Sequence, residues 1–265
     1  MTSLMPFKKC LLVTALLLPA STLIADTIPG ARGSIEITPL IHSSVQLEYQ
    51  GMVVQVDPWG VRGLPGAKPA DIILITDNPA HHLDVDAIAR LSKDSTHVVI
   101  PANSLEALPT GVVLNNGEML RAAGLTIEAI AAYDIIPGAP EHPKGDANGY
   151  LLELGEKRFF FAGVTECVAE VQALQNIDVA FLPMNIPVGR MTPEATTECA
   201  RIIDPDIVYL YHYDQNYATR AVRPDFPTAI LDSGLTIEQS LDLFEQLMAD
   251  SGIEVRRGDF YPPLD

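Results

Sequence analysis

Runs that alternate between apolar and polar residues are the feature of this sequence that most limits its fold. Residues 34–38 and 45–49 alternate with a period of two, and Gln50-Gly51 separates the second run from the apolar residues 52–56. Period-two alternation interrupted by a glycine turn is typical of a β-hairpin. The first part of the chain is therefore expected to open a sheet with antiparallel strands.

The second half of the chain repeats this pattern. Residues 151–154 and 158–161 are the arms of another predicted hairpin, and Gly155-Glu156 is its turn. Further strands are expected at residues 72–76, 98–100, 125–131, 179–182 and 207–210, and helices at residues 84–91, from Thr192 onward and at 236–250. Two hairpin-led halves with helices between later strands favour two sheets packed face to face with helices outside, an αββα four-layer sandwich.

The first 25 residues have the layout of an export signal. Lys8 and Lys9 precede 11 mostly apolar residues, 10–20, and small residues follow before Asp26. A membrane-spanning helix needs about 20 apolar residues, which is more than this run offers. We therefore expect a signal peptide at 1–25 and one mature domain at 26–265 that is periplasmic or secreted and does not insert into a membrane.

Charge and cysteine content restrict the partners and the compartment. The chain has 17 basic and 34 acidic residues, so its surface should repel phosphate backbones, and nucleic-acid binding is excluded. Cys167 and Cys199 are the two cysteines of the expected mature chain. A disulfide fits an exported protein, but buried thiols are also common, and the sequence leaves this pairing open.

Polar loops that follow predicted strands carry four of the six histidines. His81 and His82 come after the strand at 72–76, His142 precedes the hairpin at 151, and His212 follows the strand at 207–210. Zinc favours imidazoles gathered from separate loops. A lone histidine is more often a hydrogen-bonded structural residue, so spacing alone leaves metal binding open.

The order of motifs along the chain resembles the metallo-β-lactamase superfamily. The matching segments are Val56-Asp57-Pro58, residues 73–77, His82-Leu83-Asp84, His142-Pro143-Lys144-Gly145, Asn148-Gly149-Tyr150, residues 161–166, residues 177–180 and Tyr211-His212-Tyr213. The sequence is most similar to the branch of ascorbate-6-phosphate lactonase-like proteins. This resemblance implies an αββα sandwich with a metal site at the common edge of its two sheets.

The sequence departs from the family pattern where the metal ligands should be. The family loop reads His-x-His-x-Asp-His, and here the corresponding residues are Asp77, Pro79, His81 and His82. Val164 stands where the family has a bridging aspartate. Proline and valine side chains have no donor atom for a metal. The resemblance therefore implies a degenerate motif that holds at most one ion.

The resemblance also suggests a role for each remaining site residue. His81, His82 and His212 would bind one zinc or other divalent transition metal, with His142 as a further ligand or a proton shuttle. Asp77 would act as the general base. Three protein ligands and one open position are the pattern of a catalytic zinc site.

Structural roles are expected for three other polar residues near these motifs. His42 should be a buried imidazole bonded within the sheet, and Asp57 a carboxylate bonded to backbone N–H groups or to a ligand histidine. Asp84 should cap the helix at 84–91. Trp59, in a Gly- and Pro-rich loop, covers either the cleft or an edge of the core.

Two functions remain open at this stage. The first is an exported hydrolase with an altered mononuclear site that acts on a small ester, lactone or phosphoester. The second is a non-catalytic protein that retains the fold and binds a small-molecule ligand or a partner. The altered loop favours the second function, whereas the retained histidines favour the first.

The leader generates the first testable prediction. The mature protein should begin near Asp26 and be recovered from the periplasmic fraction, because the leader contains the long apolar run. Intact-mass measurement of the protein from cell fractions checks this. Full-length chain in the membrane fraction would contradict it.

Overall fold

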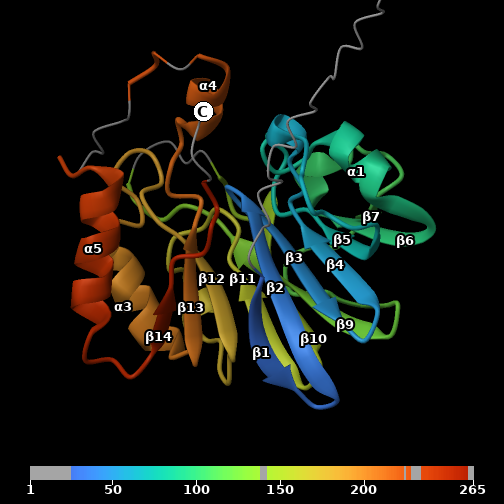
Figure 1. Cartoon of the computed structure of the whole chain (residues 1–265), viewed down its shortest axis with the longest axis horizontal. Coiled ribbons are helices and arrows are strands. Elements are labelled where there is room, and N and C mark those ends of the chain that lie inside the picture. Colours follow the sequence, from blue (N-terminus) through green and yellow to red (C-terminus); the bar gives the residue numbers. More distant parts are fainter. Residues whose placement is uncertain (1–24, 138–141, 224, 228–233, 262–265) are drawn as a thin grey trace, which may run out of the picture.

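The computed structural model describes residues 25–137, 142–223, 225–227 and 234–261 (Figure 1). Apart from Ala25, the predicted signal peptide lies outside the described residues. The described chain forms two seven-stranded sheets. Within these residues, no helix combines the length and the apolar character that crossing a membrane requires.

The first sheet contains the first seven strands in chain order. They are β1 (Asp26–Gly30), β2 (Gly33–Ile41), β3 (Ser44–Tyr49), β4 (Met52–Val56), β5 (Ala70–Leu74), β6 (Ser92–Ile100) and β7 (Val112–Val113). Strands β1 to β4 pair antiparallel, and β4 to β7 pair parallel.

The second sheet has the same organisation. Its strands are β8 (Met119–Ala122), β9 (Leu125–Ala132), β10 (Ala147–Leu154), β11 (Lys157–Phe161), β12 (Val179–Pro183), β13 (Ile207–Tyr211) and β14 (Glu254–Arg256). Strands β8 to β11 pair antiparallel, and β11 to β14 pair parallel. Each sheet therefore places several parallel strand ends on one edge.

The described helices are α1 (Val85–Leu91), α2 (Ala169–Gln172), α3 (Pro193–Ile203), α4 (Tyr217–Val222) and α5 (Ile237–Met248), with short 3₁₀ turns η1 (Gly60–Arg62) and η2 (Ala102–Ser104). In Figure 1, α4 lies beyond the ends of the strands. Figure 1 shows α3 and α5 beside the second sheet and α1 beside the first. The predicted αββα four-layer sandwich is confirmed.

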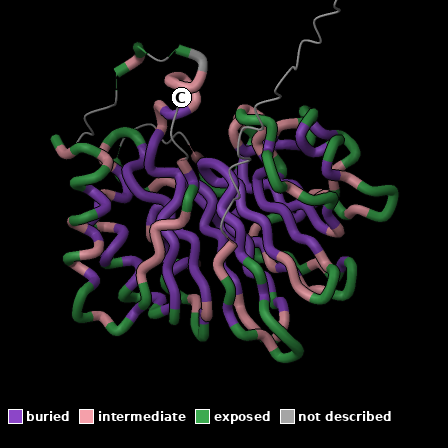
Figure 2. The backbone as a smooth tube through the Cα atoms, in the orientation of Figure 1, coloured by how far each residue is buried: buried purple, intermediate pink, exposed green. Residues whose placement is uncertain are grey.

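Three apolar clusters hold these layers together. Most interior strands are largely buried, whereas the edge strands β1, β7, β8 and β14 are mostly intermediate or exposed (Figure 2). Between the sheets, Phe181 stacks on Phe161 and on Tyr209 with ring centroids 4.7 and 4.8 Å apart. The other two clusters lie under α1 and under α3 and α5. The core thus fixes the position of both sheets relative to each other.

The predicted helix starts are confirmed by their caps. The carboxylate of Asp84 accepts the Ala87 N–H at 3.0 Å, and Thr192 caps α3, which begins with Pro193. Thr236 and Gln239 form a reciprocal capping box at the start of α5. Each cap satisfies backbone N–H groups that have no partner inside the helix.

The strands that the sequence analysis missed are the four edge strands. β1, β7, β8 and β14 are the first and last strands of the two sheets. An edge strand pairs on one side only and is often short, so its sequence shows weak alternation. The strands inside each sheet were all predicted, although β6 begins at Ser92, well before the predicted residue 98.

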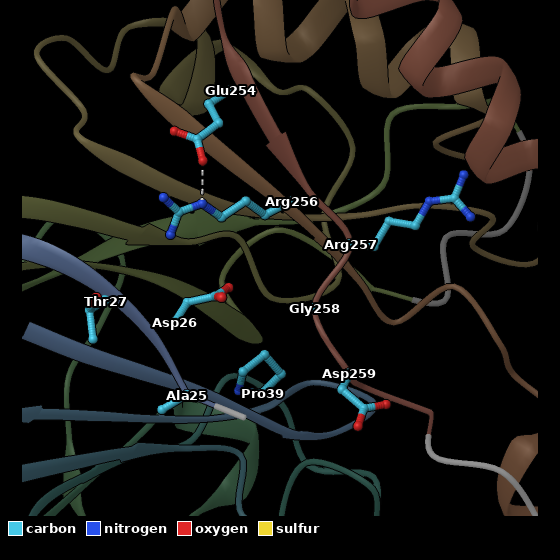
Figure 3. A pocket seen from close by; sticks show the side chains of 9 residues that line it. All are labelled: Ala25, Asp26, Thr27, Pro39, Glu254, Arg256, Arg257, Gly258 and Asp259. Carbon is cyan, nitrogen blue, oxygen red and sulfur yellow. Dashed lines mark hydrogen bonds and ion pairs between the residues drawn. The ribbon is translucent and has the colours of Figure 1, made fainter. Parts of the chain in front are cut away.

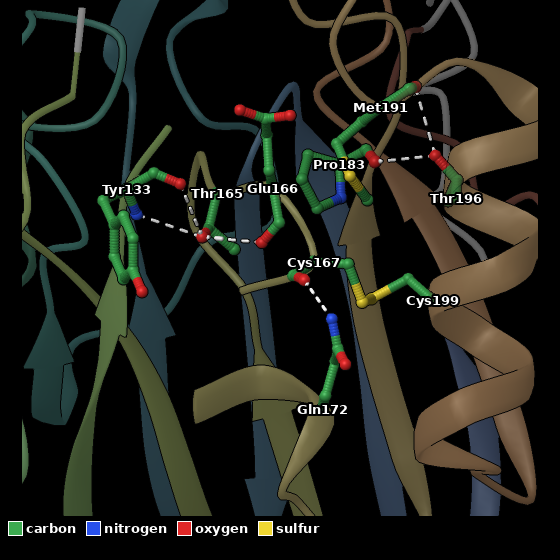
Figure 4. The surroundings of a disulfide bond; sticks show 9 residues. All are labelled: Tyr133, Thr165, Glu166, Cys167, Gln172, Pro183, Met191, Thr196 and Cys199. Atoms are coloured by element: carbon green, nitrogen blue, oxygen red, sulfur yellow. Dashed lines mark hydrogen bonds between the residues drawn. A yellow bond between two sulfur atoms is a disulfide. The ribbon is translucent and has the colours of Figure 1, made fainter. Parts of the chain in front are cut away.

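A disulfide joins Cys167 to Cys199, the pairing that the sequence left open (Figure 4). Their Cα atoms are 5.6 Å apart, which is within the range for a disulfide. Cys167 lies in the loop after β11, and Cys199 lies on α3, where its side chain is buried. The bridge therefore ties a loop at the sheet edge to the outer helix layer.

This bridge generates a prediction on stability. It joins two residues that are 32 apart in the sequence. By restricting the unfolded chain, a bridge over this separation should stabilise the folded protein by about 3–4 kcal/mol. The double variant Cys167→Ala/Cys199→Ala should lose about that much unfolding free energy in urea denaturation. Dithiothreitol should destabilise the wild type similarly and leave the variant unchanged. Equal stability of the two proteins would contradict this prediction.

Candidate metal centre

Four imidazole rings converge where the two sheets share an edge. His42 lies in the turn between β2 and β3, His81 and His82 lie in the loop after β5, and His212 follows β13. The ring centroids of His42 and His212 are 3.9 Å apart, and those of His81 and His82 are 4.4 Å apart. We call these four residues the imidazole group. The structure brings together His81, His82 and His212 and adds His42.

Backbone hydrogen bonds and turns hold this edge in place. The His212 N–H donates to the carbonyl of His42 at 3.1 Å, which joins the second sheet to the first. Both residues have left-handed backbone conformations, with φ of 55° and 57°. Such conformations are uncommon outside glycine and occur where sharp turns present functional side chains. The chain turns here as soon as each strand ends.

Three of the four rings are anchored through Nδ1. The Nδ1–H of His82 donates to Asp57 at 2.7 Å, and a 2.7 Å hydrogen bond joins Nδ1 of His42 to the Tyr261 hydroxyl. The Gln215 side-chain N–H donates to Nδ1 of His212 at 3.0 Å, so a neutral His212 carries its proton on Nε2. In His82 the proton on Nδ1 leaves the lone pair of Nε2 for a metal, and such an anchored ring is typical of metal-binding histidines.

The environment keeps the rings of His42, His81 and His212 uncharged. Burial, followed by the neighbouring imidazoles, lowers the pKa of His42 and of His212 well below the ordinary value. Burial and then the His82 ring lower the pKa of His81 to about 3. Metal binding requires neutral imidazoles, because the lone pair must be free of a proton. These three rings are therefore in the protonation state that a metal needs.

The spacing of the ring nitrogens fits one transition-metal ion. Nε2 of His82 and Nε2 of His212 are 3.1 Å apart, a separation at which two nitrogens either share a proton or face a common cation. Ligand atoms of His42, His81 and His212 all lie within 4.8 Å of one another. Tetrahedral zinc with bonds of about 2.0–2.1 Å separates its nitrogen ligands by about 3.3 Å. Imidazole donors suit zinc, copper, iron or nickel.

The carboxylate of Asp57 is fully buried behind His82. It accepts hydrogen bonds from the Thr76 N–H at 2.7 Å and from the Thr76 hydroxyl at 2.6 Å, besides the bond from His82. The prediction that Asp57 bonds to backbone and to a candidate ligand is confirmed. No lysine or arginine of the described chain pairs with Asp57, whose ring partner is His82.

The other two predicted site residues, Asp77 and His142, pair with each other. Nε2 of His142 lies 3.3 Å from Oδ2 of Asp77, and Asn103 donates to Oδ1 at 2.6 Å. Burial would raise the pKa of Asp77, but these hydrogen bonds, His142 first, and the charge of His82 lower it to about 2. Asp77 is therefore ionised at neutral pH and already bonded to His142 and Asn103.

His142 is held between two carboxylates. Nδ1 lies 3.3 Å from Asp134, opposite the contact of Nε2 with Asp77. Burial would lower the pKa of His142, but the hydrogen bond and charge of Asp77 and the charge of Asp134 raise it above its ordinary value. Arg190 forms an ion pair with Asp134 in turn. His142 lies outside the imidazole group.

Sequence reasoning missed Asp134 and Arg190. Asp134 comes two residues after β9, and Arg190 lies in the loop between β12 and α3. Both positions follow strand ends, the same signal that pointed to the histidines. Charged residues are common in such loops, and nothing in the sequence shows that these two are buried.

The two residues without a donor atom at family ligand positions, Pro79 and Val164, have structural roles. The Pro79 carbonyl accepts the N–H groups of His82 at 2.8 Å and Leu83 at 2.9 Å, so it forms the turn that presents the histidines. Val164 is buried in the apolar cluster under α3 and α5. Trp59 packs edge-on against His81 and His42, with centroids 6.0 and 5.6 Å away.

A hollow of about 630 Å³ lies elsewhere, between the edge strands β1 and β14 (Figure 3). Four of the charged side chains that line it, those of Asp26, Glu254, Arg256 and Arg257, already have partners. Arg256 contacts Glu254 at 2.6 Å, Asp26 accepts the Tyr209 hydroxyl at 2.6 Å, and Arg257 pairs with carboxylates of α5. The hollow has no chemistry comparable to that of the imidazole group.

Comparison with known proteins gives a consistent result. The family model described as a beta-lactamase superfamily domain matches residues 36–212. A UPF0173 metal-dependent hydrolase of Enterococcus faecalis is 26% identical over 202 residues, which are 65% of this chain and 84% of that protein. The region that the family model matches begins in β2 and ends at His212.

Solved structures extend the similarity to most of the chain. A protein of Parabacteroides distasonis, assigned as a metal-dependent hydrolase, is 33% identical, with a TM-score of 0.76 over 90% of this chain and 99% of its own. The metallo hydrolase Igni18 of Ignicoccus hospitalis is 19% identical, with a TM-score of 0.61 over 84% of this chain and 94% of its own. The second of these shows likeness of fold alone.

The position of Asp57 behind His82 generates a prediction. Asp57→Asn preserves the size of the side chain but removes the charge that orients the ring, so zinc affinity should fall about 10–100-fold. Competition with a chromophoric chelator measures this. Asp84→Asn is the matched control, because it changes a helix-capping carboxylate at no cost to the cap. Unchanged zinc affinity in Asp57→Asn would count against the role of Asp57.

Proposed function

The chain belongs to the metallo-β-lactamase superfamily, and from this premise we propose that it is a hydrolase that depends on one divalent metal ion. The observation that carries the proposal is the meeting of four imidazole rings at one sheet edge, where ligand atoms of His42, His81 and His212 lie within 4.8 Å of one another and Asp57 anchors the neighbouring ring of His82. A ring anchored by a carboxylate is typical of metal-binding histidines.

His81, His82 and His212 are the proposed ligands, and His42 is a further candidate. When bound, a divalent ion supplies Lewis-acid chemistry to a substrate oxygen or to water. The imidazole group holds and orients that ion, and Asp57 fixes the ring of His82. His81 is the ring with the most solvent contact in the group, so the open side of the site lies next to it.

Asp77 and His142 are proposed to handle the proton. Asp77 lies in the same loop as His81 and is ionised at neutral pH, as a general base must be. Both nitrogens of His142 face carboxylates, which favours the role of proton shuttle over that of ligand. The hydrogen bond between the two side chains gives a proton a direct path between them.

A small ester, lactone or phosphoester is the proposed substrate class. The fold of the relatives supports hydrolysis but does not distinguish among these bonds. We also propose that the protein is exported to the periplasm or secreted. The predicted leader and the disulfide between Cys167 and Cys199 support an oxidising compartment.

A second candidate function rests on the loop that departs from the family motif. Neither Pro79 nor Val164 offers a donor atom, so fewer ligands are present than in the family pattern. A protein that retains the fold and binds a ligand or partner without catalysis would also show these residues. The metal content of the purified protein separates the two functions.

The imidazole group generates the corresponding prediction. The purified, dialysed protein should retain one equivalent of zinc or another transition metal by elemental analysis. With His81, His82 and His212 as the ligands, His82→Ala or His212→Ala should each abolish tight binding, because the two remaining ligand imidazoles hold zinc far more weakly than three. His97→Ala is the matched control, since His97 is exposed on β6 outside the group.

Activity completes the test. Turnover of an ester, lactone or phosphoester should disappear with a chelator and return with metal. Two equivalents of metal in the wild type would refute the one-ion site. No metal and no chelator-sensitive turnover would refute the hydrolase and leave the binding function.

A further inference from the structure

Trp59, the single tryptophan of the chain, lies beside the imidazole group. Its ring centroid is 6.0 Å from that of His81 and 5.6 Å from that of His42, with interplanar angles of 63° and 62°. The side chain is half-buried and also packs against the apolar cluster under α1. The imidazole group therefore has an aromatic neighbour that retains contact with solvent.

Backbone hydrogen bonds fix the segment that carries this ring. The Trp59 N–H donates to the Ser44 hydroxyl at 3.1 Å, and the Gly60 N–H donates to the Asp84 carboxylate at 2.8 Å. Asp57, two residues before Trp59, accepts the hydrogen bond from His82. The same short segment therefore positions a candidate ligand ring and the tryptophan ring.

The tryptophan ring lies next to the open side of the site. His81, the imidazole with the most solvent contact, is also one of the two rings that Trp59 contacts. Aromatic rings interact at centroid separations of about 4.5–7 Å. A substrate whose reacting carbonyl reaches an ion held by His81 therefore has its adjoining group within reach of Trp59.

The indole ring favours an apolar or aromatic group over an anionic one. The face of an aromatic ring carries negative electrostatic potential, which attracts the edge of a second ring and repels a phosphate. The 34 acidic and 17 basic residues of the chain add to this repulsion of anions. A neutral substrate with a ring or an apolar chain meets neither obstacle.

We infer that Trp59 is a specificity-determining residue that selects esters and lactones with an apolar or aromatic group beside the scissile bond. This inference rests on the proposed function and narrows its substrate class, because it favours neutral esters and lactones over phosphoesters. The sequence left open whether Trp59 covers the cleft or an edge of the core. The ring contacts both, since it packs on the cluster under α1 and on His81.

The binding test uses a ketone that has the shape of an ester but cannot be hydrolysed. Benzylacetone is the ketone analogue of benzyl acetate, and methyl ethyl ketone lacks its phenyl group. Because the chain has one tryptophan, the tryptophan fluorescence reports contact with Trp59 directly. Benzylacetone should change this emission saturably, whereas methyl ethyl ketone should cause linear collisional quenching alone. The titration is run with a chelator, so that its outcome does not depend on a bound metal.

Variants distinguish a contact with the probe from a structural role of Trp59. By saturation-transfer NMR, Trp59→Ala should bind benzylacetone about 10-fold more weakly, and Trp59→Phe should retain most of the affinity. Tyr49→Ala is the matched control, because Tyr49 is a half-buried ring at the end of β3 away from His42. With metal present, Trp59→Ala should raise KM for benzyl acetate, leave kcat nearly unchanged and leave methyl acetate unaffected.

The outcomes separate this inference from the proposed function. Saturable benzylacetone binding that depends on Trp59, without hydrolysis of benzyl acetate, would support the inference and contradict the hydrolase. Hydrolysis of benzyl acetate with a linear emission change in the wild type would overturn the inference and leave the hydrolase standing. Equal benzylacetone affinities of the wild type and a folded Trp59→Ala protein would also overturn the inference.

Discussion

The buried carboxylate of Asp57 is the interaction on which this edge of the molecule depends. It lies at the end of β4, holds the first residues beyond β5 through Thr76, and orients His82. A fully buried carboxylate without an arginine or lysine partner is costly unless positive charge is nearby. A cation bound to Nε2 of His82 would supply that positive charge, because the ring lies between the cation and the carboxylate of Asp57. The negative charge of Asp57 at the end of β4 thus favours a cation at the imidazole group.

The two halves of the edge solve the same electrostatic problem in different ways. In the imidazole group, burial and the neighbouring rings keep His42, His81 and His212 uncharged. Beside this group, the carboxylate of Asp134 is paired with Arg190, a positive charge that belongs to the chain. This ion pair is complete once the protein has folded.

Much of the fold could be predicted from the sequence because interior strands are strongly patterned. The run at 72–76 is apolar in consecutive positions, as expected of a strand covered on both faces. The glycine turns indicate where the hairpins lie. The edge strands β1, β7, β8 and β14 lack such a hydrophobic pattern, because each is short or pairs with a neighbouring strand on one side only. The disulfide could not be decided either, since the approach of Cys199 to Cys167 depends on how α3 packs.

The site was predictable to the extent that strand ends are predictable. His81, His82 and His212 follow strands, and so do Asp134 and Arg190, which were missed. Asp134 and Arg190 were missed because a single sequence does not reveal that a charged loop residue is buried. His42 illustrates the same limit: its contact with His212 exists because a hydrogen bond joins the turn after β2 to the end of β13, 170 residues later in the chain. A contact between side chains of two different sheets, such as this one, can be identified once the packing of both sheets is known.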